Sequence, residues 1–215
     1  MIEKIKASKS EKIIFIFVIS LAIFSLGSFF LIKNKCLFVK DYNPEKLTFE
    51  KPNNIAILNV ECGNVIIELY PNISPVSVER FKTLVRAKAY DDVAFHRVIK
   101  DTLVQAGDLE FGKKGNIDYG KIGTGKSGLG TIKSEINSPF DFERGSVGLA
   151  RQKRYNTEDS QFFIILRDEP LYESEYTPIG KVIYGIKALE KIKYFNKSEY
   201  VLRPDYINSI RMLID

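Results

Sequence analysis

The longest apolar stretch of the chain lies near its N-terminus. Residues 13–32 (IIFIFVISLAIFSLGSFFLI) contain no charged side chain. As a helix this stretch would measure about 30 Å, the thickness of the hydrocarbon core of a bilayer. Its serine and glycine residues are scattered, so it lacks the polar face that a soluble core helix shows. The pattern therefore predicts a single transmembrane helix over 13–32.

The sequence leaves two alternatives for this segment, a retained anchor and a cleaved signal peptide. Ser25 and Gly27 are small enough to precede a cleavage site after Gly27, but the apolar run continues to Ile32, which favours retention. Lysines flank both sides of the run, at positions 4, 6, 9 and 12 and at positions 33, 35 and 40. A short basic tail over 1–12 before an apolar run favours a single-pass protein of the cell membrane. Its body would be extracytoplasmic (periplasmic), with secretion after cleavage as the alternative.

Beyond the apolar run, the chain divides into a tether and one body. Residues 33–52 contain two X-Pro pairs, Asn43-Pro44 and Lys51-Pro52, which are typical of an extended tether. From residue 53 to residue 215, short β-rich runs are bounded by turn residues. They predict strands at 55–61, 65–70, 94–99, 103–106, 146–150, 161–166, 179–183 and 206–213. The first two runs are separated by Cys62-Gly63-Asn64, which predicts a hairpin.

Two helices are predicted among these strands. Ser74 is placed as an N-cap and Pro75 as the first helical residue, and apolar residues follow at helical spacing at 78, 81, 84 and 85. A second helix is expected over 186–194. Two helices among about eight strands favour a mainly β fold, a barrel capped by helices, over a parallel α/β sheet. The Gly- and Lys-rich stretch 108–145 predicts a long surface loop.

The charge of the chain lies in its N-terminal part. The net charge is +5, and residues 1–40 account for all of it with seven Lys and two Glu, which leaves 25 basic and 25 acidic residues beyond them. The body has no basic excess to hold a phosphate backbone, so nucleic-acid binding is disfavoured. Cys36, Cys62 and His96 are too few for a metal cluster. A disulfide between the two cysteines is compatible with the sequence, which offers no support for it.

One motif matches the phosphate-loop pattern G-x-x-x-x-G-K-S, at residues 120–127. Such a loop needs a buried strand before it and a helix N-terminus after it, so that backbone amides face the phosphates. Polar residues precede this match, and Gly128 and Gly130 follow it, where they disfavour a helix. We therefore interpret the match as a coincidence within a glycine-rich loop.

A more informative pattern is a series of four motifs, FHRVI at 95–99, QAGD at 105–108, LAR at 149–151 and SQFFI at 160–164. Each alone is typical of ordinary structure, a rim arginine, a structural histidine or a pair of core phenylalanines. Their order and spacing together resemble the cyclophilin family of peptidyl-prolyl isomerases. The resemblance covers nearly all of residues 53–215, and it includes Gly-Thr-Gly at 123–125 and Gly-Lys-Val at 180–182.

The resemblance implies a closed eight-stranded antiparallel β-barrel capped by two α-helices, with the active groove on its outer face. By motif position, Arg97 corresponds to the catalytic arginine. The substrate-binding residues implied are His96, Leu103, Gln105, Ala150, Arg151, Gln161, Phe163, Leu171, Tyr172 and Tyr176. Leu171 stands where many members carry Trp, Thr102 where many carry Phe, and Tyr176 where His is common. These departures predict an altered substrate preference, and they leave Arg97 unchanged.

The reaction implied is rotation about X-Pro peptide bonds. No bond is broken, so neither a metal nor another cofactor is expected, and His96 is expected to have no acid–base role. The expected partners are proline-containing polypeptides and, through the N-terminal helix, the membrane; we expect a monomer that assists protein folding there. The alternatives are a tethered proline-peptide binding module or chaperone without turnover, and a structural subunit of an envelope assembly.

Overall fold

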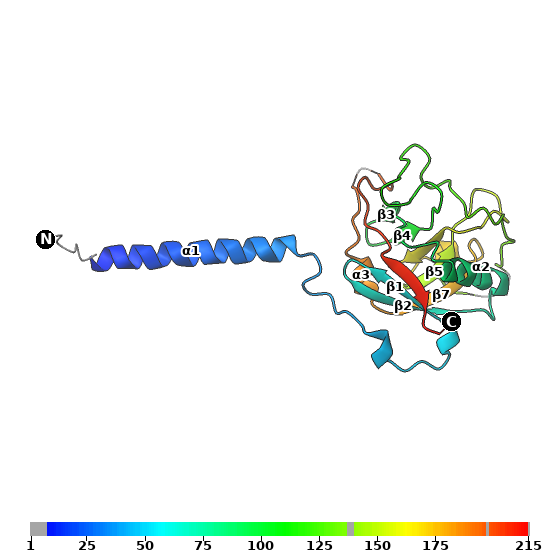
Figure 1. The fold of residues 1–215 in the computed structure, drawn as a ribbon, viewed down its shortest axis with the longest axis horizontal. Helices are drawn as coiled ribbons and strands as arrows, with labels where there is room; N and C mark the ends of the chain where they lie inside the picture. Colours follow the sequence, from blue (N-terminus) through cyan, green and yellow to red (C-terminus); the bar gives the residue numbers. More distant parts are fainter. Residues whose placement is uncertain (1–7, 137–139, 197, 215) are drawn as a thin grey trace. The chain divides into compact units, whose positions relative to one another are not determined.

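The computed structural model describes residues 8–136, 140–196 and 198–214, and the chain divides into two compact units, Met1–Phe38 and Val39–Asp215. The first unit contains helix α1 (Lys9–Lys33), drawn in blue in Figure 1. Its stretch Lys9–Phe29 is long and apolar enough to cross a membrane, and none of it is buried. The predicted helix over 13–32 is therefore confirmed as a helix, and it is a candidate membrane anchor or signal sequence.

The body unit is built around one eight-stranded antiparallel sheet (Figure 1). Its strands are β1 (Ile55–Val60), β2 (Gly63–Leu69), β3 (Arg97–Ile99), β4 (Leu103–Ala106), β5 (Ser146–Leu149), β6 (Phe162–Ile165), β7 (Pro178–Tyr184) and β8 (Ser209–Met212). They lie in the order β3-β4-β6-β5-β7-β2-β1-β8. Each predicted strand is present, and the predicted mainly β class is confirmed.

The sheet curls into a half-barrel that stays open, so the expectation of a closed barrel is wrong. β3 and β8 are its two edges, and they do not pair with each other in the described part of the chain. Instead, single backbone bonds bridge the gap: the amide of Asp92 donates to the Ile207 carbonyl (2.8 Å) and that of Phe95 to the Asp205 carbonyl (2.9 Å). These bonds surround an isolated bridge between Ala94 and Tyr206 and do not continue into a ladder.

The outer face of β1 and β2 is covered by the segment that precedes them. Ile55, Ile57 and Ile66 are buried, and Tyr42, Leu47 and Phe49 pack against them. A polar contact holds the start of this segment: the Asp41 carboxylate accepts the amide of Asn64 at 2.8 Å. The body unit accordingly begins at Val39, and the second part of the predicted tether lies on the sheet.

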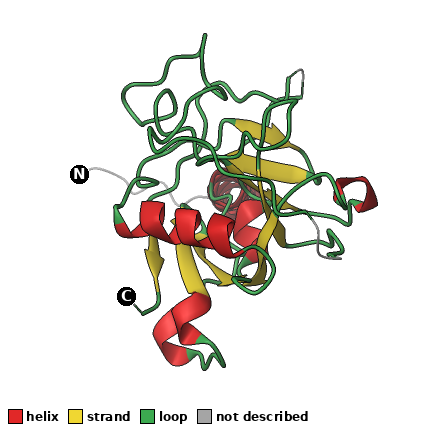
Figure 2. Ribbon diagram, turned by 90° about the vertical axis from the view of Figure 1, so that its right-hand side faces the viewer, coloured by secondary structure: helices red, strands yellow, loops and turns green. Residues whose placement is uncertain are grey.

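Helix α2 (Pro75–Arg86) buries the apolar positions that its spacing predicts, 78, 81, 84 and 85. Ser74 occupies the N-cap position, but its hydroxyl donates to the Pro178 carbonyl instead of accepting a helical amide. The Glu135 carboxylate accepts those amides, from Val76 at 3.2 Å and Ser77 at 2.8 Å. The helix is thus capped by the long loop that Figure 2 shows above it.

The second helix is shorter than predicted. α3 spans Ile186–Leu189, and the next amides bond three residues back, Lys191 to the Ala188 carbonyl and Ile192 to the Leu189 carbonyl. The amide of Lys193 then donates to the Asp205 carboxylate at 2.9 Å. Because these donors leave the α-helical pattern, the helix ends after one turn. Short 3₁₀ turns, η1 (Pro44–Lys46), η2 (Pro52–Asn54) and η3 (Pro170–Tyr172), complete the element list.

Candidate active site

A row of four residues crosses the four adjacent strands from the β3 edge of the sheet, β3, β4, β6 and β5. Arg97 on β3 faces Gln105 on β4, Gln105 faces Phe163 on β6, and Phe163 faces Gly148 on β5. Directly opposed residues of antiparallel strands project to the same side of a sheet. A charged side chain, an amide and an aromatic ring therefore lie side by side, although up to 66 positions separate them in the sequence.

Gly148 completes this row, and its lack of a side chain leaves space for the Phe163 ring. A Cβ atom at this position would lie 2.5 Å from Cζ of Phe163 and 3.1 Å from Cε1 of Phe142. Phe163 is buried, and its ring stacks on Phe142 at a centroid distance of 6.1 Å. The glycine therefore sets where the Phe163 ring can lie.

A chain of hydrogen bonds fixes the polar side chains. Nη1 of Arg97 donates to Oε1 of Gln105 (3.1 Å), and Nε2 of Gln105 donates to Oε1 of Gln161 (3.0 Å). Nε2 of Gln161 in turn donates to the carbonyls of Gly123 and Gly125, both at 3.0 Å. A carbonyl oxygen only accepts hydrogen bonds, so the side-chain NH2 of Gln161 must face Gly123 and Gly125. The Gln161 oxygen then faces the NH2 of Gln105, and the Gln105 oxygen faces Arg97.

Beside this chain lies a notch of about 200 Å³, whose exposed lining is mainly polar. Its walls include Leu103, Phe163, Tyr172 and Tyr176, with Arg97, Gln105, Ala150, Arg151 and Tyr200 around them. The rings of Phe163 and Tyr176 meet edge to face at 5.1 Å, and those of Phe163 and Tyr172 at 5.5 Å. Burial, followed by the nearby Tyr176, raises the pKa of Tyr172, so its hydroxyl stays protonated.

A second hollow of about 130 Å³ adjoins the notch. It is lined by Gln105, Gln161, the glycine-rich segment 123–126 and parts of the 150–160 loop. Gln105, Gly123, Ala150 and Arg151 border both hollows. An extended peptide that filled both would pass these shared residues.

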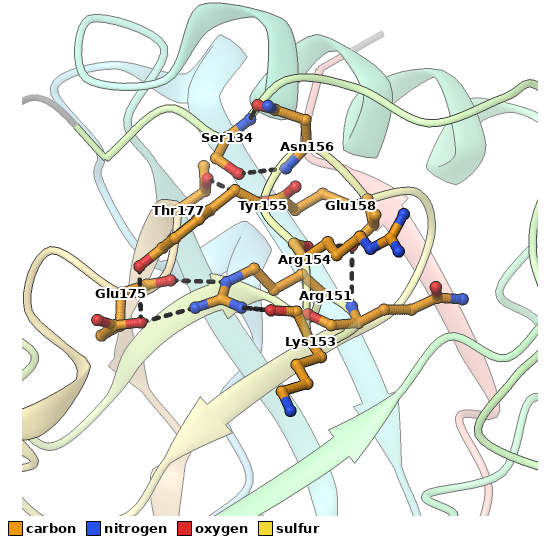
Figure 3. A network of polar contacts seen from close by, with 11 residues as sticks. Ser134, Arg151, Lys153, Arg154, Tyr155, Asn156, Glu158, Glu175 and Thr177 are labelled. Carbon is orange, nitrogen blue, oxygen red and sulfur yellow. Dashed lines mark hydrogen bonds and ion pairs between the residues drawn. The ribbon is translucent and has the colours of Figure 1, made fainter.

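The side chain of Arg151 is already engaged (Figure 3). Its three nitrogens donate to the Glu175 carbonyl (2.9 Å), the Glu175 carboxylate (2.7 Å), the Gln152 carbonyl (3.1 Å) and the Lys153 carbonyl (3.2 Å). The guanidinium also lies 4.2 Å from the Tyr155 ring centroid and 5.1 Å from that of Tyr176. Arg151 therefore fastens the 152–155 loop to the segment around Glu175, and all three of its side-chain nitrogens are already bonded.

Two of the predicted binding residues, His96 and Leu171, border neither hollow. His96 is 1% exposed, and neither ring nitrogen has a hydrogen-bond partner of suitable geometry in the described structure. Burial, which outweighs the attraction of Asp108, lowers the pKa of His96 to about 4, so the ring is neutral at physiological pH. Leu171 in η3 is 83% exposed and lies outside the residues that border either hollow.

The match to a phosphate loop has a structural explanation. The amides of Gly123 and Gly125 donate to Oδ2 of Asp108, at 2.7 and 3.0 Å, and the Asp108 carboxylate is fully buried. Ser127 donates through its amide and hydroxyl to Asp159. The backbone donors that would hold a phosphate are thus occupied by the protein's own carboxylates, in agreement with the sequence interpretation.

Sequence reasoning missed two residues at the notch, Glu199 and Tyr200. Oε2 of Glu199 accepts the Nε hydrogen of Arg97 at 2.7 Å, and Tyr200 forms part of the notch wall. Glu199 lies 102 positions from Arg97, in a stretch without strand periodicity, so no local signal could have located it. Gly148 was also missed, although a glycine within an apolar strand is a recognised sign of close approach.

Comparison with known proteins agrees with this geometry. Residues 55–212 match the family model described as cyclophilin type peptidyl-prolyl cis-trans isomerase/CLD. A probable peptidyl-prolyl cis-trans isomerase of Brucella suis is 42% identical over 160 residues, which cover 73% of this chain and 81% of that protein. A peptidyl-prolyl cis-trans isomerase-like 3 protein of Gallus gallus is 32% identical over 152 residues, covering 68% and 86%.

A solved structure extends the comparison to the fold. The cyclophilin type isomerase of Cryptosporidium parvum, determined in the presence of the dipeptide Ala-Pro, superposes with a TM-score of 0.64 at 25% identity. The match covers 74% of this chain and 98% of that one. These matches identify the class of protein as an isomerase of prolyl peptide bonds. The chain belongs to the cyclophilin-type peptidyl-prolyl cis-trans isomerase family.

Proposed function

We propose that Arg97 is the catalytic residue of this isomerase and that the notch beside it holds the proline ring. One observation carries the proposal: Arg97 has hydrogen-bond donors to spare at the notch. Its Nε and Nη1 are bonded to Glu199 and Gln105, and its Nη2 has no partner among the described residues. A guanidinium carries five N–H donors and remains charged at every relevant pH, so this nitrogen can serve a substrate.

The chemistry of rotation explains why a donor suffices. An amide resists twisting because the nitrogen lone pair is delocalised into the carbonyl, with a barrier of about 18–20 kcal/mol. As the plane twists, the lone pair localises on the prolyl nitrogen and becomes a hydrogen-bond acceptor. A donor aimed at that nitrogen therefore stabilises the transition state more than either planar isomer, which accelerates exchange.

The remaining groove residues have positioning and binding roles in this proposal. Leu103, Phe163, Tyr172 and Tyr176 are the aliphatic and aromatic residues of the notch, and they would contact the proline ring. Gln105 holds one terminal nitrogen of Arg97 in place. The peptide on the other side of the prolyl bond would extend past Ala150 and Gln161 into the second hollow. Proline-containing polypeptides are thus the proposed substrates, and the Ala-Pro dipeptide named with the Cryptosporidium parvum structure supports this class.

The experiment is a measurement of cis–trans exchange in a proline peptide by NMR, with the full chain in detergent micelles. Wild type should accelerate exchange and Arg97→Ala should not, although the peptide should still bind. Arg86→Ala is the matched control, because Arg86 also pairs with a glutamate but lies on α2. Wild-type binding without accelerated exchange would contradict the proposal and favour the alternative of a tethered binding module.

We propose further that α1 anchors the enzyme in the cell membrane, with the body on the extracytoplasmic side. The length and apolarity of Lys9–Phe29 support an anchor. The short basic tail before the apolar run resembles an export signal and supports this orientation. Protease added to intact spheroplasts should digest the body while α1 stays with the membrane. Protection of the body until the cells are lysed would place it in the cytoplasm.

A further inference from the structure

The segment that carries Glu199 is held against β3 on both sides. The amide of Val98 donates to the Glu199 carbonyl at 2.8 Å, and the amide of Val201 donates to the His96 carbonyl at 3.0 Å. These bonds flank an antiparallel bridge between Arg97 and Tyr200. The backbone at Glu199 is therefore fixed next to Arg97, so the contact between their side chains does not depend on a free loop.

The Tyr200 ring fixes the segment a second time. A Cβ atom at Gly123 would lie 3.1 Å from Cε1 and 3.4 Å from the hydroxyl of Tyr200. The ring thus lies against the glycine-rich segment whose carbonyls orient Gln161. One short stretch of chain consequently contacts both ends of the hydrogen-bond chain that includes Arg97.

Arg97 is held from two directions as a result. Gln105 binds Nη1 from β4, and Glu199 binds Nε from the opposite side of β3. If Gln105 alone bound it, the planar guanidinium of Arg97 could still rotate about that single hydrogen bond. A second contact at Nε removes the rotation and fixes where the unbonded Nη2 lies.

We propose that Glu199 is a positioning residue that holds the Arg97 guanidinium in its productive orientation, an inference that rests on the proposed role of Arg97. The ion pair is partly exposed, with side-chain exposures of 29% for Arg97 and 53% for Glu199. Exposed pairs contribute little to folding, because water screens the charges and the side chains lose freedom. The effect of Glu199 should therefore appear in catalysis and in the state of Arg97, while the stability of the protein stays unchanged.

The test uses the full chain in detergent micelles and three variants, Glu199→Ala, Glu199→Gln and Glu79→Ala. Glu79 is the matched control, since it pairs with Arg86 through one contact of 3.3 Å and lies on α2. The first readout is the ¹H–¹⁵N resonance of Arg97 Nε, assigned by its loss in Arg97→Ala. The second is kcat/KM for a proline peptide.

The expected result is a displaced Arg97 Nε resonance in Glu199→Ala and a loss of about tenfold in kcat/KM, below the hundredfold that a misplacement of about 1 Å can cause. Glu199→Gln should recover at least half of the lost activity on a logarithmic scale, because its amide oxygen can accept the same hydrogen. Glu79→Ala should match wild type in both readouts.

The inference is overturned if the Arg97 resonance stays in place in Glu199→Ala, if kcat/KM stays within twofold of the Glu79→Ala control, or if Glu199→Gln is no better than Glu199→Ala. Failure of the proposed function looks different. In that case wild type does not accelerate exchange, or Arg97→Ala is as active as wild type, and the role of Glu199 in catalysis fails with it. An inactive Arg97→Ala beside a fully active Glu199→Ala would overturn the inference alone.

Discussion

The two arginines that border the notch differ in how many of their donors are free. Arg97 is bonded at Nε and Nη1 and keeps Nη2 without a partner in the described structure. Arg151 donates from all three of its nitrogens to backbone and carboxylate oxygens, and it lies close to two tyrosine rings. Both are paired with a glutamate, Glu199 and Glu175 respectively. The difference indicates which of the two arginines has a side-chain nitrogen available to a substrate.

The two arginines also differ in the kind of group that accepts their hydrogen bonds. The bonds of Arg97 come from side chains, which fix its orientation and leave one edge of the guanidinium available. The bonds of Arg151 go mainly to main-chain carbonyls of its own loop and of Glu175, as Figure 3 shows. We therefore expect Arg97 to govern turnover and Arg151 to govern the shape and stability of the groove.

The strongest test of this comparison is the replacement of Arg97. Arg97→Ala should lower kcat/KM by about 10²–10³-fold, the loss that typically follows removal of one transition-state donor. Arg97→Lys should recover only part of this, because an ammonium group lacks the planar fork that binds Glu199 and Gln105 together. The thermal unfolding midpoint should change little in either variant. Activity within tenfold of wild type in Arg97→Ala would remove the distinction between the two arginines.

His96 provides the next test, because it adjoins Arg97 and is buried in neutral form. Its pKa is about 4 in the folded protein, against about 6.5 when unfolded. Between these values the unfolded chain binds a proton that the folded chain does not, so stability falls as the pH drops from 6.5 to 4. The loss should reach about 3 kcal/mol, at 1.36 kcal/mol for each pH unit.

Chemical denaturation of wild type and His96→Gln between pH 7 and pH 4 measures this effect. The difference in unfolding free energy between the two pH values should be smaller in the variant by about that amount, since glutamine binds no proton. The pH–rate profile of wild type should show no inflection near neutral pH. An inflection there that His96→Gln removes would give His96 an acid–base role and contradict the assignment of catalysis to Arg97.

A smaller effect is expected from Arg151→Ala. The side chain is 9% exposed, and its removal leaves the Glu175 and Lys153 carbonyls without a donor and two tyrosine rings without a cation. We expect a loss of about 2 kcal/mol in unfolding free energy from these contacts. The reduction in kcat/KM should be well below that of Arg97→Ala. Arg167→Ala is the control, because Arg167 also pairs with a glutamate but is 63% exposed. A stable Arg151→Ala with activity as low as that of Arg97→Ala would reverse the two roles.

Much of the fold follows from local patterns in the sequence. β4 has the predicted ends, Leu103 and Ala106, because a short apolar run between turn residues leaves little choice of boundary. The opposed positions of Arg97 and Gln105 follow once two such strands are joined by a short turn. Most of the residues that line the notch were expected only from the family resemblance, and no local pattern placed them.

Contacts between distant segments could not be predicted in this way. Glu199 beside Arg97 and Glu135 at the start of α2 are placed by backbone paths that no periodicity encodes. The packing of Tyr42, Leu47 and Phe49 on the sheet was not predicted, because the X-Pro pairs nearby are typical of an extended tether.

The smallest expected effect belongs to Leu171, which motif position assigned to the proline pocket. Its side chain is 83% exposed, while Leu103, of the same residue type, is 1% exposed and lines the notch. Leu171→Ala should keep kcat/KM within about twofold of wild type and unfolding free energy within about 0.5 kcal/mol, as surface substitutions usually do. Leu103→Ala should lower both, because it empties a buried position beside Arg97. Peptide-exchange kinetics and denaturant unfolding of the two variants measure the contrast. If Leu171→Ala reduced activity as much as Leu103→Ala, substrate would have to contact Leu171 itself, and the groove would extend past the notch.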